Sequence, residues 1–367
     1  MNVLVSGGGT AGHVFPALAL ARRLVEDHGA HVRFLGTADG PEARLVPEAG
    51  FAFDAVDARP LRRDLSVETF MAPVAAVRSI SACRPFVECA DVVVGMGGYV
   101  SVPVGLAAAR TRRPLVLHEQ NAVPGLANRA LARRARTVAL TFAEAASRFP
   151  RRARTVVTGN PVRGSVLRVL DDREALAKEG LDELDLEPGR PTLVVFGGSQ
   201  GALHVDLAAV EAIGLLDRPD LQVLILTCPA HERRIAEAIP DGPVRIRVRG
   251  FLDRMEFAYA VADLVVARAG ATTCAELSVC GIPAVLVPYP HATGGHQEAN
   301  ARAVERAGGA VVVMDDALSG ASLAAVVSEL LEAPERLATM RGRMRSWSRP
   351  DAASVLAAVV AEAGGLR

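Results

Sequence analysis

Short runs of β-branched and apolar residues alternate along this chain with alanine-rich segments whose apolar residues recur at helical spacing. A strand that is apolar along its whole length is buried on both faces, as happens in parallel sheets covered by helices. The sequence therefore predicts an α/β fold of doubly wound, Rossmann-like sheets. We expect strands at 2–6, 31–36, 92–95, 115–118, 137–141, 155–158, 192–197, 222–227, 244–248, 264–267, 284–288 and 310–313. Helical spacing marks 16–28, 125–135, 204–215, 230–238, 274–280, 297–307 and 350–363.

The alternation breaks near residues 160–163, and residues 171–190 are charged, acidic and contain Pro188-Gly189. We interpret this stretch as a linker with a peripheral helix between two domains. The 367 residues suffice for two domains of ordinary size. The expected domains are 1–163 and 164–346, followed by a C-terminal helix within 347–367 that packs back on one of them, the N-terminal domain by preference. Two such domains facing each other place a ligand cleft between the carboxyl ends of both sheets.

Charged and sulfur-containing residues exclude several classes of protein. The 41 basic and 41 acidic side chains balance, which argues against a nucleic-acid binder. Lys178 is the only lysine and stands in a stretch that looks like a loop, so a GxxxxGK[ST] phosphate loop is absent and a Schiff-base enzyme is disfavoured. The five cysteines include no C-x-x-C pair, and no His, Cys, Asp or Glu cluster has metal-ligand spacing. We expect free thiols and no bound metal or cofactor.

No segment predicts a signal peptide or a membrane-spanning helix. The N-terminus has no basic start, and glycines interrupt its apolar run at once. The uncharged stretch 92–109 contains four glycines and a proline, which would expose backbone groups to lipid. A buried strand, a glycine turn and a helix explain it better, so we expect a soluble protein.

Four glycine-bearing turns follow expected strands, at 7–13, 95–101, 197–201 and 268–276. Glycine lets the backbone approach a ligand, and a helix N-terminus offers unpaired N–H groups with partial positive charge. Such turns can bind a diphosphate without lysine or metal. The alternative is that they are ordinary strand-to-helix turns.

Two motif matches point to other classes of enzyme. Gly7, Gly9 and Gly12 satisfy GxGxxG, but the second strand lacks the acidic residue that binds the ribose of NAD. Gly197, Ser199 and Gly201 satisfy the GxSxG of α/β-hydrolases, with Asp263 and His291 or His296 following in order. A hydrolase would leave the first glycine turn, the second domain and 268–276 without a function. A nucleotide-binding protein without enzymatic activity is a third alternative.

His13 and Glu276 are the two side chains best placed for chemistry and recognition. His13 follows a glycine turn at a helix start, where the positive helix end would keep the imidazole neutral and able to accept a proton. Alternatively it caps the helix or contacts a phosphate. Glu276 stands one turn into a helix, where its carboxylate can accept both hydroxyls of a ribose. The alternative is a favourable interaction with the helix dipole. The polar segment 288–297 is placed to bind sugar hydroxyls.

Seven segments together closely resemble the MurG family of peptidoglycan glycosyltransferases. They are 8–17 (GGTAGHVFPA), 97–101 (GGYVS), 118–128 (HEQNAVPGLAN), 159–163 (GNPVR), 197–202 (GGSQGA), 268–276 (RAGATTCAE) and 288–300 (PYPHATGGHQEAN). They run in the family's order and span almost the whole chain, and Ala11 stands where many members have glycine. The resemblance implies a two-domain fold of glycosyltransferase B type. It also implies inverting transfer of N-acetylglucosamine from UDP-N-acetylglucosamine to undecaprenyl-diphospho-muramoylpentapeptide.

The resemblance further implies site residues. The C-terminal domain would bind the donor and the N-terminal domain the lipid acceptor. His13 is the expected general base, with Glu119 a second candidate. The implied donor-binding residues are Thr10, Ala11, Gly12, Asn121, Arg163, Ser199, Gln200, Phe251, Leu252, Ala271, Thr272, Thr273, Glu276 and Gln297.

A lipid acceptor implies a peripheral enzyme on the cytoplasmic side of the bacterial cell membrane. The segment 61–63 and the helix from Phe70 to Ile80 mix apolar residues with arginine, as interfacial helices do. An ordinary core-packed helix is the alternative. The acceptor-side and membrane candidates are Arg62, Arg63, Phe70, Met71, Arg78 and Tyr99.

Overall fold

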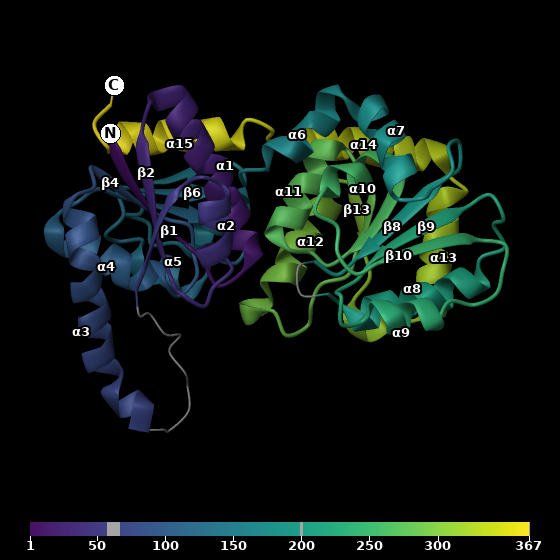
Figure 1. The fold of residues 1–367 in the computed structure, drawn as a ribbon, viewed down its shortest axis with the longest axis horizontal. Helices are drawn as coiled ribbons and strands as arrows, with labels where there is room; N and C mark the ends of the chain where they lie inside the picture. Colours follow the sequence, from purple (N-terminus) through teal and green to yellow (C-terminus); the bar gives the residue numbers. More distant parts are fainter. Residues whose placement is uncertain (57–66, 199–200, 367) are drawn as a thin grey trace. The chain divides into compact units, whose positions relative to one another are not determined.

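The computed structural model describes residues 1–56, 67–198 and 201–366, with only the backbone of 67–76. The chain forms two compact units. Unit 1 comprises Met1–Arg163 and Pro350–Arg367, and unit 2 comprises Gly164–Arg349. Each unit is built on one parallel sheet (Figure 1).

Unit 1 contains a seven-stranded sheet in the order β3-β2-β1-β4-β5-β6-β7, with every neighbouring pair parallel. Its strands are β1 (Asn2–Ser6), β2 (His31–Gly36), β3 (Ala52–Ala55), β4 (Val92–Gly95), β5 (Leu115–Glu119), β6 (Thr137–Leu140) and β7 (Thr155–Val157). Its helices are α1 (Ala11–His28), α2 (Glu42–Glu48), α3 (Val67–Glu88), α4 (Ser101–Thr111), α5 (Leu126–Leu131), η1 (Ala143–Arg148) and α15 (Ala352–Ala363).

Helices cover both faces of this sheet (Figure 1). Alternate strand residues belong to the two core clusters on its opposite faces. Val3 and Val5 of β1 pack with α1 and α15, whereas Leu4 packs with α3 and α4. The buried residues of α15 belong to the same cluster as those of α1. The last helix of the chain therefore completes unit 1.

Unit 2 contains a six-stranded parallel sheet in the order β10-β9-β8-β11-β12-β13. Its strands are β8 (Thr192–Phe196), β9 (Gln222–Leu226), β10 (Arg245–Arg249), β11 (Leu264–Ala267), β12 (Ala284–Leu286) and β13 (Ala310–Val312). Its helices are α6 (Gly164–Asp171), α7 (Arg173–Glu183), α8 (Leu203–Leu215), α9 (Glu232–Glu237), α10 (Met255–Val261), α11 (Ala271–Cys280), η2 (Thr293–Gly295), α12 (His296–Arg306), η3 (Asp315–Ala317), α13 (Gly320–Leu331) and α14 (Pro334–Trp347). Val195 packs with α8 and α13 on one face, and Phe196 meets Tyr259 of α10 on the other, with ring centroids 6.1 Å apart.

Three sequence-based expectations differ from the structure. The edge strand β3 was not expected, because Ala-Phe-Asp-Ala lacks β-branched residues. Lys178 lies inside α7 and not in a loop. Helix α1 begins at Ala11, earlier than its apolar periodicity indicates, so Thr10 is its N-cap residue. Helix α11 begins at Ala271 with Gly270 as its N-cap residue, which agrees with the expected position of Glu276 one turn into a helix.

No helix among the described residues is long and apolar enough to cross a membrane. The segment 92–109 forms β4, a glycine turn and most of α4, as the sequence predicts.

Candidate functional site

The first glycine loop of unit 1 connects β1 to α1 and carries Thr10 and His13. Thr10 Oγ1 and His13 Nδ1 are 2.9 Å apart, and the backbone N–H of His13 donates to Thr10 O over 3.0 Å. Thr10 occupies the N-cap position in an extended conformation, but its side chain caps no backbone N–H. Its hydroxyl is therefore used to hold the imidazole ring.

The second glycine loop follows β4, the neighbour of β1, and fits against the first. Gly97 and Gly98 have φ angles of +100° and +79°, which favour glycine. A Cβ atom on Gly97 would lie 3.0 Å from His13 Cδ2, and one on Gly98 would lie 2.6 Å from Gly8 O. The two loops approach this closely because neither residue has a side chain.

The segment after β5 is organised by Glu119, whose side chain is buried. Oε1 accepts from Asn121 N over 3.0 Å, and Oε2 accepts from Gly125 N over 3.0 Å and from Asn128 Nδ2 over 2.9 Å. Burial raises the pKa of Glu119, although these hydrogen bonds oppose the shift. The carboxyl group thus fixes the loop that carries the half-buried Asn121.

His118, next to Glu119, is fully buried in the sheet. Its Nε2 lies 3.0 Å from Gly159 O. Burial lowers the pKa of His118 to about 4, so the ring is neutral at physiological pH. His118 is a structural residue of this edge.

Arg163 and Tyr99 complete the same carboxyl edge of the first sheet. The Arg163 guanidinium lies over the ring of Phe15, 4.5 Å from its centroid, and Phe15 follows His13 by two positions in α1. Tyr99 lies against Gly9, since a Cβ there would be 3.4 Å from Tyr99 Cε1. Unit 1 thus gathers Thr10, His13, Tyr99 and Arg163 around two glycine loops.

In unit 2, the N-terminus of α11 is not capped by a side chain. Gly270 is the N-cap residue, no side chain caps the helix, and its first turn contains no acidic residue. Cys274 N–H closes the first turn of the helix on Gly270 O over 2.9 Å. A helix N-terminus of this kind attracts anions.

Glu276 lies one turn further along α11 and is buried. Tyr259 Oη donates to its Oε2 over 2.7 Å. Thr272 and Thr273 are half-buried near the helix start, Phe251 is 68% exposed, and Leu252 is half-buried.

Arg268 is a residue to which sequence reasoning assigned no role. It directly follows β11, is 8% exposed, donates to Pro288 O over 3.1 Å and pairs with Asp315. Its guanidinium also lies 5.5 Å from the ring centroid of Tyr289, whose N–H donates to Gln297 Oε1 over 3.0 Å. Arg268 and Gln297 therefore hold the loop after β12. The sequence feature that could have indicated this role is an arginine directly after an apolar strand.

Several candidate residues lie outside the described structure. They are Arg62, Arg63, Ser199 and Gln200, together with the side chains of Phe70 and Met71. Arg78 is described and is exposed on α3. Within the described residues, no group of three or more His, Cys, Asp and Glu side chains could hold a metal ion.

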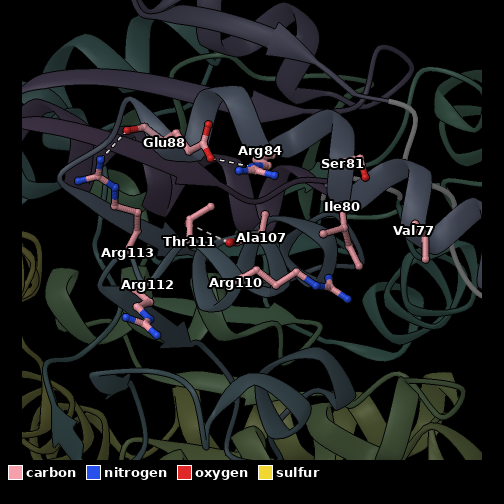
Figure 2. Close-up of a pocket in the computed structure, with 10 residues that line it drawn as sticks. All are labelled: Val77, Ile80, Ser81, Arg84, Glu88, Ala107, Arg110, Thr111, Arg112 and Arg113. Carbon is pink, nitrogen blue, oxygen red and sulfur yellow. Dashed lines mark hydrogen bonds and ion pairs between the residues drawn. The ribbon is translucent and has the colours of Figure 1, made fainter.

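A groove of about 690 Å³ between α3 and α4 carries a cluster of arginines (Figure 2). Arg84 pairs with Glu88, and Arg113 donates to Glu88 O over 2.7 Å. Residues 110–163 contain 12 arginines and only two carboxylates. Sequence reasoning missed this cluster of arginines, although a count of charged residues by segment would have found it. The lining residues are Val77, Ile80, Ser81, Arg84, Glu88, Ala107, Arg110, Thr111, Arg112 and Arg113.

Family models identify the class of protein. The glycosyltransferase family 28 N-terminal domain matches residues 3–140, and the family 28 C-terminal domain matches residues 192–356. The chain belongs to glycosyltransferase family 28, whose two domains correspond to the two sheets described above.

Individual relatives narrow this further. The chain is 41% identical to a UDP-N-acetylglucosamine–N-acetylmuramyl-(pentapeptide) pyrophosphoryl-undecaprenol N-acetylglucosamine transferase of Halothermothrix orenii, over 97% of both chains. It is 42% identical to the protein of the same name from Moorella thermoacetica, over 98% of both chains. The crystal structure of Acinetobacter baumannii MurG superposes with a TM-score of 0.79 at 29% identity, covering 98% of this chain and 99% of that one. The resemblance to the MurG family and the B-type glycosyltransferase fold are thus confirmed.

Proposed function

We propose that this enzyme transfers N-acetylglucosamine from UDP-N-acetylglucosamine to the muramoyl 4-hydroxyl of undecaprenyl-diphospho-muramoylpentapeptide. The observation that carries the proposal is the uncapped N-terminus of α11 with buried Glu276 one turn later. This arrangement suits a nucleoside diphosphate, and relatives that align over nearly the full chain are named for this transfer.

In this proposal unit 2 holds the donor. The amides of Ala271, Thr272 and Thr273 bind the diphosphate and stabilise its charge as the sugar leaves. Glu276 accepts the ribose hydroxyls, and Gln297, whose Oε1 is used by Tyr289, offers its amide N–H groups to the sugar. By family resemblance Phe251 and Leu252 border the uracil, and Ser199 and Gln200 contact the phosphates.

Unit 1 supplies the base and the acceptor contacts. The 4-hydroxyl oxygen attacks the anomeric carbon from the face opposite UDP, its proton passes to His13, and UDP leaves with inversion. If Nδ1–H donates to Thr10 Oγ1, the Nε2 lone pair is the one that takes this proton. Thr10, Ala11, Gly12, Asn121 and Arg163 contact the donor in the family pattern.

Glu119 remains the second candidate for the base, and the geometry favours a different function for it. Both of its carboxylate oxygens already accept hydrogen bonds from within the loop, and the side chain is buried. We therefore propose that Glu119 positions Asn121 and that His13 receives the proton.

A thermal-shift panel of UDP-sugars, followed by transfer to a short-chain lipid acceptor, tests the proposal. UDP-N-acetylglucosamine should stabilise the enzyme most. His13→Ala should lower kcat by about 10²–10⁴-fold with little change in donor affinity. Retained turnover in His13→Ala would transfer the role of base to Glu119, and absence of donor binding would contradict the proposal.

We further propose that the enzyme works peripherally at the cytoplasmic face of the membrane that carries its lipid acceptor. The support is the groove between α3 and α4, which is lined by the exposed Arg110 and Arg112 and by Val77, which is 59% exposed (Figure 2). Arginine beside apolar surface suits an interface rich in anionic lipid.

A further inference from the structure

Glu42 is a buried carboxylate to which the proposed mechanism gives no function. It begins α2, and only 1% of its surface is exposed. Oε1 accepts from Thr37 N over 3.1 Å and from Thr37 Oγ1 over 2.8 Å. Oε2 accepts from Gly9 N over 3.1 Å. One carboxylate therefore ties the loop after β2 to the glycine loop after β1.

Three glycines leave the space that this carboxyl group occupies. A Cβ atom on Gly8 would lie 2.2 Å from Glu42 Oε1, and one on Gly40 would lie 2.3 Å from Oε2. A Cβ atom on Gly36 would lie 2.6 Å from Glu42 Cγ. Three separate positions, two in loops and one at the end of β2, thus leave room for one side chain.

The contact at Gly9 leads directly to His13. Gly9 has a φ of +85°, and the next residue is Thr10, whose carbonyl and hydroxyl both bond to His13. Fixing the Gly9 amide therefore fixes the residue that orients the imidazole. The same hydrogen bond occupies Gly9 N–H, so this amide is already used by a resident carboxylate.

We propose that Glu42 is a positioning residue for the glycine loop and, through Thr10, for the His13 imidazole. Its effect on turnover rests on the proposed function, because that function makes His13 the base. Its effect on the orientation of His13 does not, and it can be measured in the absence of any substrate.

Glu42→Gln is the sharpest test because it keeps the size of the side chain. The amide has only one acceptor oxygen, so its NH₂ group must face either Gly9 N–H or the Thr37 donors. Glu48→Gln is the matched control, since Glu48 is on the same helix, is 54% exposed and pairs with Arg44 at its surface. Thermal melting shows whether each variant is folded.

We expect Glu42→Gln to move the His13 imidazole resonances, assigned with His13→Ala, and to lower kcat by up to about 10²-fold. The KM for UDP-N-acetylglucosamine should change less than kcat, because the proposed diphosphate and ribose contacts lie in unit 2 and only the contact at Thr10 lies in the affected loop. The pH profile of kcat should shift together with the titration of His13. Glu48→Gln should change none of these.

Unmoved His13 resonances with wild-type kcat in folded Glu42→Gln would overturn the inference. If that variant does not fold, Thr37→Val decides, since it removes one donor to Oε1 and leaves Gly9 N–H in place. Movement of His13 in Thr37→Val would support the inference, and no movement would overturn it. A wild-type enzyme without transferase activity would contradict the proposed function instead, while the resonances would still report on Glu42.

Discussion

Four ionisable side chains near the carboxyl edge of the first sheet are fixed in different ways. His13 is paired with Thr10, Glu42 and Glu119 accept backbone N–H groups, and His118 is buried against Gly159 O. Of these, the sequence indicated His13 through its position after a glycine turn. It could not show that the two glutamates are committed to loops, because their donors are backbone groups that are distant in sequence or depend on the loop conformation.

Burial of His118 predicts a specific loss of stability in acid. Its pKa is lowered from 6.5 to about 4, so between these values the unfolded chain binds a proton that the folded chain does not. The free energy of unfolding should therefore fall, by up to about 3 kcal/mol from this residue, as the pH drops from 6.5 to 4.

Urea unfolding of wild type and His118→Gln across this range measures the effect. The free energy of unfolding, plotted against pH, should have a steeper slope for wild type than for His118→Gln. The difference should correspond to close to one proton, because glutamine does not titrate. Parallel curves would show that His118 is protonated in the folded protein.

Glu119→Gln should act through the loop that carries Asn121. The amide cannot accept at both of the oxygen positions, which leaves a buried N–H group without an acceptor at a cost of about 1–3 kcal/mol. Differential melting should show this loss, and steady-state kinetics should show a higher donor KM. A fall in kcat alone at unchanged stability would instead support Glu119 as the base.

At the scale of elements, strands with β-branched and continuous apolar runs were predictable and the others were not. β1, β2, β4 and β11 match their expected bounds: Val and Leu make up most of β1, β4 and β11, and β2 contains Val32, Phe34 and Leu35. β3 has neither feature, and α7 contains Lys178 in an acidic stretch whose helix is stabilised by packing on α10. Tertiary packing overrides local pattern in both cases.

The starts of α1 and α11 show a second limit of sequence reasoning. Both helices begin with residues that lack apolar periodicity, Ala11–Gly12–His13 and Ala271–Thr272–Thr273. These first turns are the parts we assign to function. Periodicity reports the buried face of a helix, so it does not mark the first turn of α1, which carries His13, or that of α11, whose amides we propose bind the diphosphate.

Ala271→Pro tests the amides of α11 without breaking the helix. Proline is tolerated at the first helical position, and Gly270 already has a compatible φ of −63° and ψ of 144°. The variant lacks one N–H donor to the diphosphate. A hydrogen bond to a charged acceptor contributes about 1.5–3 kcal/mol, so the Kd should rise roughly 10–100-fold.

Calorimetric titration with UDP measures this change. Leu126→Pro is the matched control, because Leu126 also follows a glycine N-cap residue, with a φ of −63°, and is exposed. Equal affinity for UDP in wild type and Ala271→Pro would show that the Ala271 amide does not bind the diphosphate.

For the whole molecule, zero net charge conceals a strong asymmetry. Residues 1–163 contain 21 arginines and 13 carboxylates, so unit 2 is acidic to a similar extent. Total composition argued against a nucleic-acid binder but could not reveal this segregation. The excess arginine is concentrated in 110–163, which includes the end of α4 beside the groove.

The arginine groove predicts selective binding to anionic membranes. Arg110→Ala/Arg112→Ala/Arg113→Ala should weaken co-sedimentation with phosphatidylglycerol vesicles by about 1 kcal/mol per arginine, or roughly 10²-fold in all. Arg23→Ala/Arg33→Ala/Arg44→Ala is the control of equal charge, since those arginines pair with Glu26, Asp54 and Glu48. If both triple variants lose vesicle binding equally, the effect comes from net charge alone and not from the groove. If the groove variant loses no vesicle binding, the proposal is contradicted.

The central claim is that one chain binds a UDP-sugar at an uncapped helix end and passes the sugar to a lipid-linked muramoyl hydroxyl. The most direct measurement incubates the enzyme with radiolabelled UDP-N-acetylglucosamine and a short-chain lipid-linked muramoylpentapeptide, and then determines the structure of the product. The account predicts a β-linked disaccharide on the lipid, formed in equal amount with UDP. Free N-acetylglucosamine with unmodified lipid, or an α-linked product, would contradict it.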